Sequence, residues 1–150
     1  MTEILFYHLQ DMTLESVLPP LLEKSLERGW RVVVQSTSEE RTEALDAHLW
    51  TYREDSFLPH ATSRVTDAED HPIVLMVEDS NPNRANVRFL VDNAPLPADS
   101  DVYDRVVLLF NGDDADALTA ARHAWTDCKA RGFDVTYWQA DERGRWQKRD

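Results

Sequence analysis

The chain has 150 residues, of which 42% are hydrophobic, and a formal net charge of -12 at pH 7. This length and apolar content predict one domain, over 1–150, with a core of its own. The negative charge argues against direct binding of DNA or RNA, because non-specific nucleic-acid affinity depends on cationic side chains. No apolar run reaches the length of a membrane span and no signal peptide is recognisable, so we expect a cytoplasmic protein without membrane contact. The single cysteine, Cys128, excludes an intrachain disulfide and is expected to be a buried apolar side chain.

The first predicted elements are a strand over 4–7 and a helix whose apolar residues recur at helical spacing up to Gly29. Pro19 and Pro20 fit best in the first turn of a helix, because proline has no N–H to donate. We therefore expect the regular part of this helix to begin near Leu18, after a bend.

Branched side chains at 32–34 predict a second strand that is buried on both faces, as in a parallel sheet covered by helices on each side. Thr37 and Glu40 have the spacing of a capping box, which starts the next helix. The polar segment 61–70 is expected to be a loop, and 73–77 a third strand.

The second half of the chain continues the alternation. Strands are predicted over 86–91 and 105–110, and a long helix over 115–131 follows the capping residues at 111–114. Residues 133–138 alternate in polarity, which predicts an edge strand with one wetter face. The basic segment 143–150 is expected to be a flexible tail. The whole pattern predicts an α/β fold: a single open, mostly parallel sheet with helices on both faces.

Such a fold often binds nucleotides, but the glycines that this chemistry needs are missing. Phosphate loops place glycines between a strand and a helix so that backbone N–H groups can approach the phosphate. Here the first strand leads into residues 8–13, which contain no glycine. The fold therefore resembles a Rossmann-like domain without a phosphate-binding loop, and we expect no cofactor.

Catalytic and metal-binding patterns are also weak. The five histidines show no pair at ligand spacing with an intervening acid, and no cysteine joins them, so no metal site is predicted. His8 ends a predicted strand, where parallel-sheet enzymes keep active groups, but a lone histidine at such a place is usually structural. Helix capping explains Asp113 and Asp114 without a metal. We assign no catalytic residues, although a small nucleotide-dependent or hydrolytic enzyme of the doubly wound class stays as the alternative function.

Two groups of side chains indicate a protein-binding surface rather than a catalytic site. Trp50 ends an amphipathic segment and Phe57 lies just before Pro59, where a helix cannot continue. Large aromatics at such breaks are often partly exposed and dominate protein interfaces, although both rings could equally seal the core.

The long predicted helix carries the second group. Arg122 and Lys129 lie seven residues apart, on nearly the same side of the helix, beside Trp125. The alternative is an ordinary solvated face, with its cations near the negative end of the helix dipole.

Short motifs along the whole chain resemble the chi subunit of bacterial DNA polymerase III holoenzyme. They are FYHL at 6–9, LLEKSLERGWRVVVQ at 21–35, LDAHLWTY at 45–52, SFLPH at 56–60, LVDNAPLP at 90–97, and ARHAWTDCKARGF at 121–133 followed by YW at 137–138. The order and spacing of these segments carry the resemblance.

The resemblance implies an adaptor of the clamp-loader assembly without a catalytic site of its own. Proteins of this family join the psi subunit and bind the acidic C-terminal tail of single-stranded DNA-binding protein. For the tail, the resemblance points to Arg122, with Trp125 and Trp50 as pocket walls and Lys129 or Arg131 as a second charge. Leu118 stands where a lysine is expected in the family.

For the psi subunit, the resemblance points to Phe57 as the main contact. Pro59 and His60 are its expected neighbours in the interface.

Overall fold

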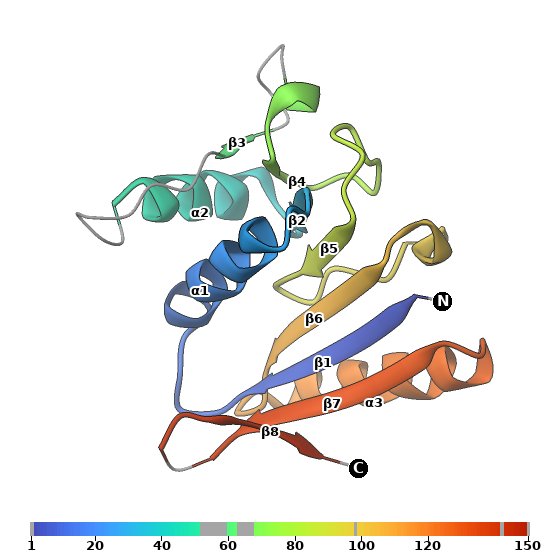
Figure 1. The fold of residues 1–150 in the computed structure, drawn as a ribbon. Helices are drawn as coiled ribbons and strands as arrows, with labels where there is room; N and C mark the ends of the chain where they lie inside the picture. The colour runs from blue at the N-terminus through green and yellow to red at the C-terminus, as the bar shows by residue number, and fades with distance from the viewer. Residues whose placement is uncertain (1, 52–59, 63–67, 98, 142, 150) are drawn as a thin grey trace.

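The computed structural model describes residues 2–51, 60–62, 68–97, 99–141 and 143–149. These residues form one eight-stranded sheet in the order β3-β4-β2-β5-β6-β1-β7-β8 (Figure 1). The strands are β1 Glu3–Leu9, β2 Val32–Gln35, β3 His60–Thr62, β4 Ile73–Met76, β5 Val87–Leu90, β6 Arg105–Asn111, β7 Asp134–Ala140 and β8 Trp146–Arg149. Every neighbouring pair is parallel except β7 and β8, which confirms the predicted mostly parallel sheet.

Helices cover both faces of the sheet, as the sequence predicted. α1 (Leu14–Glu27) and α2 (Glu39–Thr51) pack on one face, where Leu18, Leu22 and Leu45 join a core with the branched residues of β2. α3 (Ala115–Ala130) packs on the other face. Its buried side chains, among them Ala121 and Cys128, are small and let the helix lie close to the sheet. The buried Cys128 has the role that the sequence predicted.

The start of α1 differs from the prediction, because both prolines lie inside the helix. Thr13 caps it by accepting a hydrogen bond from the Ser16 N–H, and no bend precedes Leu18. Pro19 has no N–H to give to the carbonyl oxygen four residues earlier. His48 Nε2, from α2, donates to that carbonyl of Glu15 at 2.7 Å. A side chain of the neighbouring helix thus replaces the backbone hydrogen bond that proline removes.

Two further expectations were wrong in detail. α2 is capped one residue later than predicted, by Ser38, whose Oγ accepts from the Arg41 N–H. Thr37 instead donates to the carbonyl of Asp92. The expected loop over 61–70 contains the end of β3, which pairs with β4, and a 3₁₀ turn at Ala68–Asp70.

The C-terminal segment also corrects the prediction of a flexible tail and an edge strand. Trp146–Arg149 form β8, which pairs antiparallel with β7, so β7 lies inside the sheet. Asp141 builds the turn between them, because its Oδ1 accepts from the N–H groups of Arg143 and Arg145. Gly144 completes the turn at a φ of 78°, where glycine has no side-chain penalty.

A buried arginine anchors the loop that follows β4. Arg88 on β5 is fully buried, and its Nε and one Nη donate to Gln35 Oε1. The remaining donors reach the carbonyls of Glu78 and Ser80 and the hydroxyl of Tyr103. Uncharged acceptors therefore solvate a cation that water cannot reach, and each bond holds a loop to the sheet.

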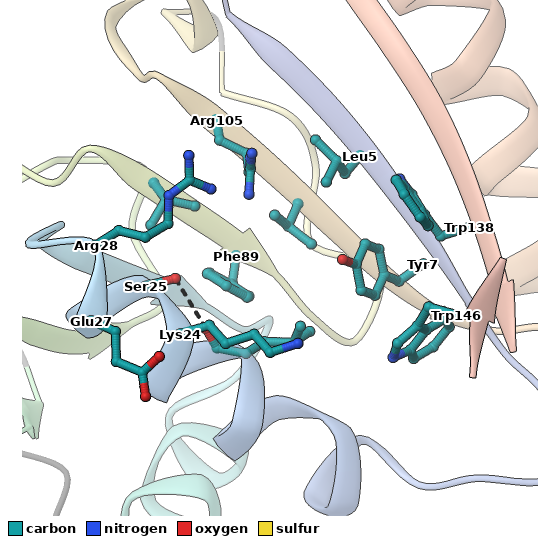
Figure 2. A pocket seen from close by; sticks show the side chains of 13 residues that line it. Leu5, Tyr7, Lys24, Ser25, Glu27, Arg28, Phe89, Arg105, Trp138 and Trp146 are labelled. Carbon is teal, nitrogen blue, oxygen red and sulfur yellow. Dashed lines mark hydrogen bonds between the residues drawn. The ribbon is translucent and has the colours of Figure 1, made fainter. Parts of the chain in front are cut away.

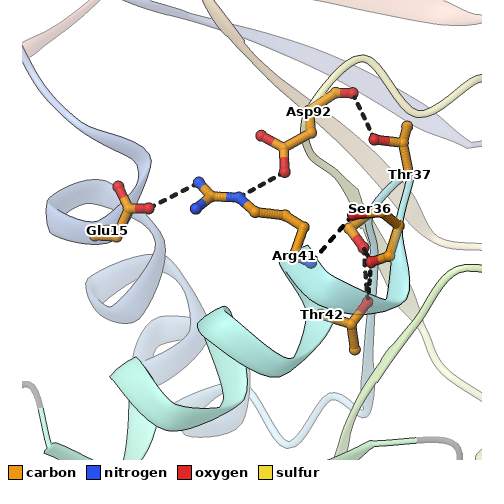
Figure 3. Close-up of polar contacts among 7 residues, drawn as sticks. Glu15, Ser36, Thr37, Arg41, Thr42 and Asp92 are labelled. Atoms are coloured by element: carbon orange, nitrogen blue, oxygen red, sulfur yellow. Dashed lines mark hydrogen bonds and ion pairs between the residues drawn. The ribbon is translucent and has the colours of Figure 1, made fainter.

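Arg41 links three elements at the carboxyl edge of the sheet (Figure 3). Its guanidinium lies 2.7 Å from Glu15 on α1 and 2.6 Å from Asp92, in the turn after β5. Burial by itself would raise the pKa of Glu15, but hydrogen bonds from its own backbone and from Arg41, with the charges of Arg41 and His48, lower it below the ordinary value. The lowered pKa means that the charged form of Glu15 stabilises the fold.

Replacing Arg41 by Met should lower the free energy of unfolding by about 1 to 2 kcal/mol at pH 7, between the values for exposed and buried ion pairs. The pKa of Glu15 is lower in the folded protein than in the unfolded chain. The part of the stability difference that comes from Glu15 is therefore fully present above the unfolded pKa, and it is lost as the pH falls through the folded pKa. Urea unfolding of both proteins from pH 7 to pH 3 measures this, with Arg143→Met, at an exposed arginine, as control. A difference that does not shrink in acid would contradict the role of Glu15.

Candidate protein-binding site

A pocket opens on the α3 face of the sheet, where Arg122 and Trp125 project from the helix. Its volume is about 450 Å³. α3 forms one wall, and residues of β1, β6, β7 and β8 form the rest. The lining residues are His8, Phe110, Leu118, Ala121, Arg122, Trp125, Thr126, Tyr137, Gln139 and Arg149.

Aromatic rings make the pocket floor rigid. Trp125 packs edge-on against Phe6 and Tyr137, with ring centroids 5.5 and 5.9 Å apart, and Tyr137 contacts Phe110 at 6.0 Å. Such edge-to-face contacts hold the rings in fixed orientations. The indole of Trp125 is only partly buried, so part of it is accessible to a ligand in the pocket.

His8 lies at the end of β1 and contributes a polar group to this floor. Its Nδ1 hydrogen-bonds the Tyr137 hydroxyl at 2.5 Å. Burial lowers the pKa of His8, which the charge of Asp113 partly offsets, and burial raises the pKa of Tyr137. The neutral imidazole is therefore favoured. Gly112 makes room for it, since a Cβ there would lie 1.7 Å from His8 Nε2.

Cationic side chains surround the aromatic floor. Arg122 on α3 and Arg149 on β8 line the pocket from two sides. Lys129 lies above Trp125, with its Nζ 5.2 Å from the ring centroid. The structure therefore brings together Arg122, Trp125 and Lys129, as the sequence predicted.

Arg149 was missed because its segment was read as a tail. The turn that ends at Gly144 was the available signal for a hairpin, and strand pairing then sets Arg149 opposite Tyr137, on the α3 face.

Trp50 lies elsewhere, which corrects its predicted place in the wall of the Arg122 pocket. It is at the end of α2, on the opposite face of the sheet from α3, and its side chain is 51% exposed. Its ring packs on His60, with centroids 4.4 Å apart. His60 itself is only 3% exposed and contacts Asp46 through Nε2. Phe57 and Pro59 lie outside the described residues.

The crevice at the carboxyl ends of β1 and β6 has a different lining. At this point the connections of the sheet switch from one face to the other, and open α/β proteins often bind ligands there. A hollow of about 350 Å³ is lined by Thr13, Glu15, Arg41, Asp92 and Asp114 among others. Glu15, Arg41 and Asp92 are the ion-paired side chains of Figure 3, so they contact each other across the crevice.

No three histidine, cysteine, aspartate or glutamate side chains among the described residues converge as metal ligands. Burial, with the charge of Asp127, raises the pKa of the Cys128 thiol to about 11, so it is protonated at neutral pH. None of the described helices has the length and apolar character that crossing a bilayer requires.

Fold and site together define an α/β domain with an aromatic pocket ringed by cations. Comparison with known proteins identifies the family. Residues 1–136 match the family model described as DNA polymerase III chi subunit, HolC. The chain belongs to this family.

One curated relative agrees with this assignment. The probable DNA polymerase III subunit chi of Rickettsia prowazekii (strain Madrid E) is 28% identical over 91 residues. The matched segment covers 61% of this chain and 55% of the relative.

Replacing Gly112 by Ala should destabilise the domain by about 1 to 3 kcal/mol, the usual cost of overpacking, because the new methyl group displaces the His8 ring. Urea unfolding measures the effect. In a His8→Ala background the same change should cost much less, since the clashing ring is gone. Equal costs in both backgrounds would show that the two residues are not coupled.

Proposed function

We propose that this chain is a non-catalytic adaptor of the clamp-loader assembly, acting in the cytoplasm. In this proposal, one surface binds the acidic C-terminal tail of single-stranded DNA-binding protein, and a second surface binds the psi subunit. The observation that carries the proposal is the Arg122 pocket, because a cationic rim around an aromatic cavity matches a ligand that ends in acidic residues and phenylalanine.

The pocket supports tail binding through two kinds of contact. The Arg122 guanidinium can pair with the terminal carboxylate of the tail in a forked, charge-assisted contact. The terminal phenylalanine ring can lie against the exposed sides of Trp125 and Tyr137 in the pocket, where it gains aromatic contacts. Tail binding therefore needs the carboxylate and the ring together.

Arg149 takes part in this proposal as the second charge. Leu118 lines the pocket where the resemblance leads one to expect lysine, so α3 offers an apolar contact at that point. Arg149 faces the same cavity from β8 and can interact with the acidic residues that precede the terminal phenylalanine. Lys129 is held over Trp125 and can do the same from the helix.

The second surface is proposed around Trp50 and Phe57. An exposed tryptophan at a helix end is the residue type that anchors protein interfaces. Because Trp50 covers His60, we now assign Trp50 to the psi surface and expect His60 to support it from below rather than to touch the partner. Trp50 and Arg122 lie on helices that cover opposite faces of the sheet, so a partner held at Trp50 leaves the Arg122 pocket open.

The tail site is tested by replacing its two arginines in turn. Arg122→Ala should weaken binding of a tail peptide by about 1.5 to 3 kcal/mol, the value of a charge-assisted contact. Arg149→Ala should weaken it by about 0.5 to 1 kcal/mol, because this side chain is exposed. Calorimetric titration measures both, and affinity should fall as salt rises.

Lys148→Ala is the matched control for Arg149, because neighbouring residues of a strand point to opposite faces. It should leave tail affinity unchanged. Unaltered affinity in Arg122→Ala would overturn the site.

The psi surface is tested by Trp50→Ala and Phe57→Ala, each of which should cost the complex about 2 kcal/mol or more. Neither should change tail binding, and Trp50→Ala should hardly alter the melting temperature, since half of its side chain is already in water. His60→Ala should destabilise the isolated domain instead, because the side chain is buried. A Trp50 variant that melts early yet binds psi normally would remove Trp50 from the interface.

A further inference from the structure

A second pocket lies on the α1 face of the sheet, on the opposite side from Arg122 (Figure 2). Its volume is about 530 Å³. The C-terminal half of α1 forms one side, and β6, β1, β7 and β8 form the floor and the far side. α1 and α2 stand over the other half of the sheet, so none of the described helices covers this half on this face (Figure 1).

The floor of this pocket is aromatic. Tyr7, Trp138 and Trp146 line it, and all three are only partly buried. Tyr7 and Trp146 pack against each other with ring centroids 4.7 Å apart. Figure 2 shows these rings on one side of the hollow, facing the side chains of α1 across it. A large apolar side chain entering here would contact rings that are already fixed in place.

Cations surround the opposite side of the hollow. Lys24 on α1 and Arg28, which caps the C-terminal end of α1, are exposed, and Arg105 comes from β6. The guanidinium groups of Arg28 and Arg105 lie 4.0 and 5.0 Å from the ring centre of Trp30, which holds both in position. Pre-positioned cations lose little entropy when an anion binds.

One polar atom beside this pocket lacks a partner within the described part of the chain. Arg105 Nε is buried and has no hydrogen bond, although its Nη2 reaches Glu3 at 3.3 Å. The side chain as a whole is 22% exposed. The protein therefore satisfies this guanidinium only in part, and its exposed N–H groups can donate to the acceptor oxygens of a ligand.

We propose that this pocket binds an acidic peptide segment of a partner protein, which inserts one aromatic side chain between Trp146 and α1. The carboxylates on either side of that residue then meet Lys24, Arg28 and Arg105. Charge complementarity carries the assignment, because these cations are gathered around one apolar hollow on a protein whose net charge is -12.

A peptide fits this surface better than a nucleic-acid strand. Glu27 and Glu3 stand among the cations, so the positive charge is not continuous. A phosphate backbone needs a continuous basic groove, and the negative charge of the whole protein would repel it. A peptide can place single carboxylates against single cations and leave the acidic positions free.

The cations lie along one side of this pocket rather than at its closed end. Side-chain carboxylates in the middle of a peptide can therefore reach them, and no free C-terminus is needed. This distinguishes the pocket from the Arg122 site, whose proposed ligand is a terminal carboxylate. The inference therefore does not depend on tail binding.

The test uses a synthetic peptide of aspartates around one central phenylalanine, with both ends blocked. Calorimetric titration of the full chain should detect binding, and the fluorescence of Trp138 and Trp146 should change. Lys24→Glu with Arg28→Glu should weaken binding about tenfold or more, since each reversal turns an attraction into a repulsion. Both positions are exposed, so folding should be retained.

Three controls make the result specific. Lys24→Glu alone should weaken binding by a smaller factor. This variant keeps the contact of Arg28 with Trp30, so any loss of binding cannot come from a disturbed Trp30 ring. Arg122→Ala should leave this peptide's affinity unchanged, while the α1 variants should leave tail-peptide affinity unchanged. A peptide with serine in place of phenylalanine should bind at least tenfold more weakly, because it loses the apolar contact.

Several outcomes would overturn the proposal. They are absence of binding by the blocked peptide, equal binding by the charge-reversed variant, and loss of binding in Arg122→Ala. The pocket would instead be assigned to nucleic acid by two results together. A single-stranded oligonucleotide would displace the peptide, and its own affinity would fall in the same charge-reversed variants.

Discussion

The covering of a wide sheet by few helices is the constraint on which the rest of this structure depends. Eight strands lie side by side, while α1 and α2 cover part of one face and α3 covers part of the other. Apolar strand residues beyond the reach of a helix must meet water, ligands or partners. Both pockets lie beside a helix over β1, β7 and β8, and both are lined by aromatic rings. Incomplete covering thus leaves two aromatic hollows open at the surface of the sheet.

β8 contributes to both faces at once. Strand alternation directs Arg149 to the α3 face and Trp146 to the α1 face, so one short strand supplies a cation to the first pocket and a ring to the second. Its hydrogen bonds with β7 hold both side chains in place. A change in the turn at Gly144 would therefore affect both surfaces together.

Charge is distributed in a way that suits a protein partner. The net charge is strongly negative, yet cations gather around the two aromatic pockets. Elsewhere, buried or half-buried arginines have structural partners: Arg88 is solvated by carbonyl, amide and hydroxyl oxygens, and Arg41 is ion-paired. Local positive fields on an acidic body steer acidic segments to particular sites and disfavour long polyanions.

The sequence by itself determined the order and type of most elements, because hydrophobic period and capping residues are local signals. The buried run of β2 and the Asp114 cap of α3 were read correctly from a few neighbouring residues. The family was also accessible from sequence, since its motifs keep their order along the chain.

Only the tertiary structure decided which side chains meet. Trp50 and Trp125 look equivalent in sequence, yet the helices after β2 and β6 that carry them lie on opposite faces of the sheet and separate them. The contact of His8 with Gly112 and the arrival of Arg149 beside Arg122 join residues more than 25 positions apart. A local pattern specifies the face on which a residue lies within its own element, but strand order and packing choose its neighbours across the sheet.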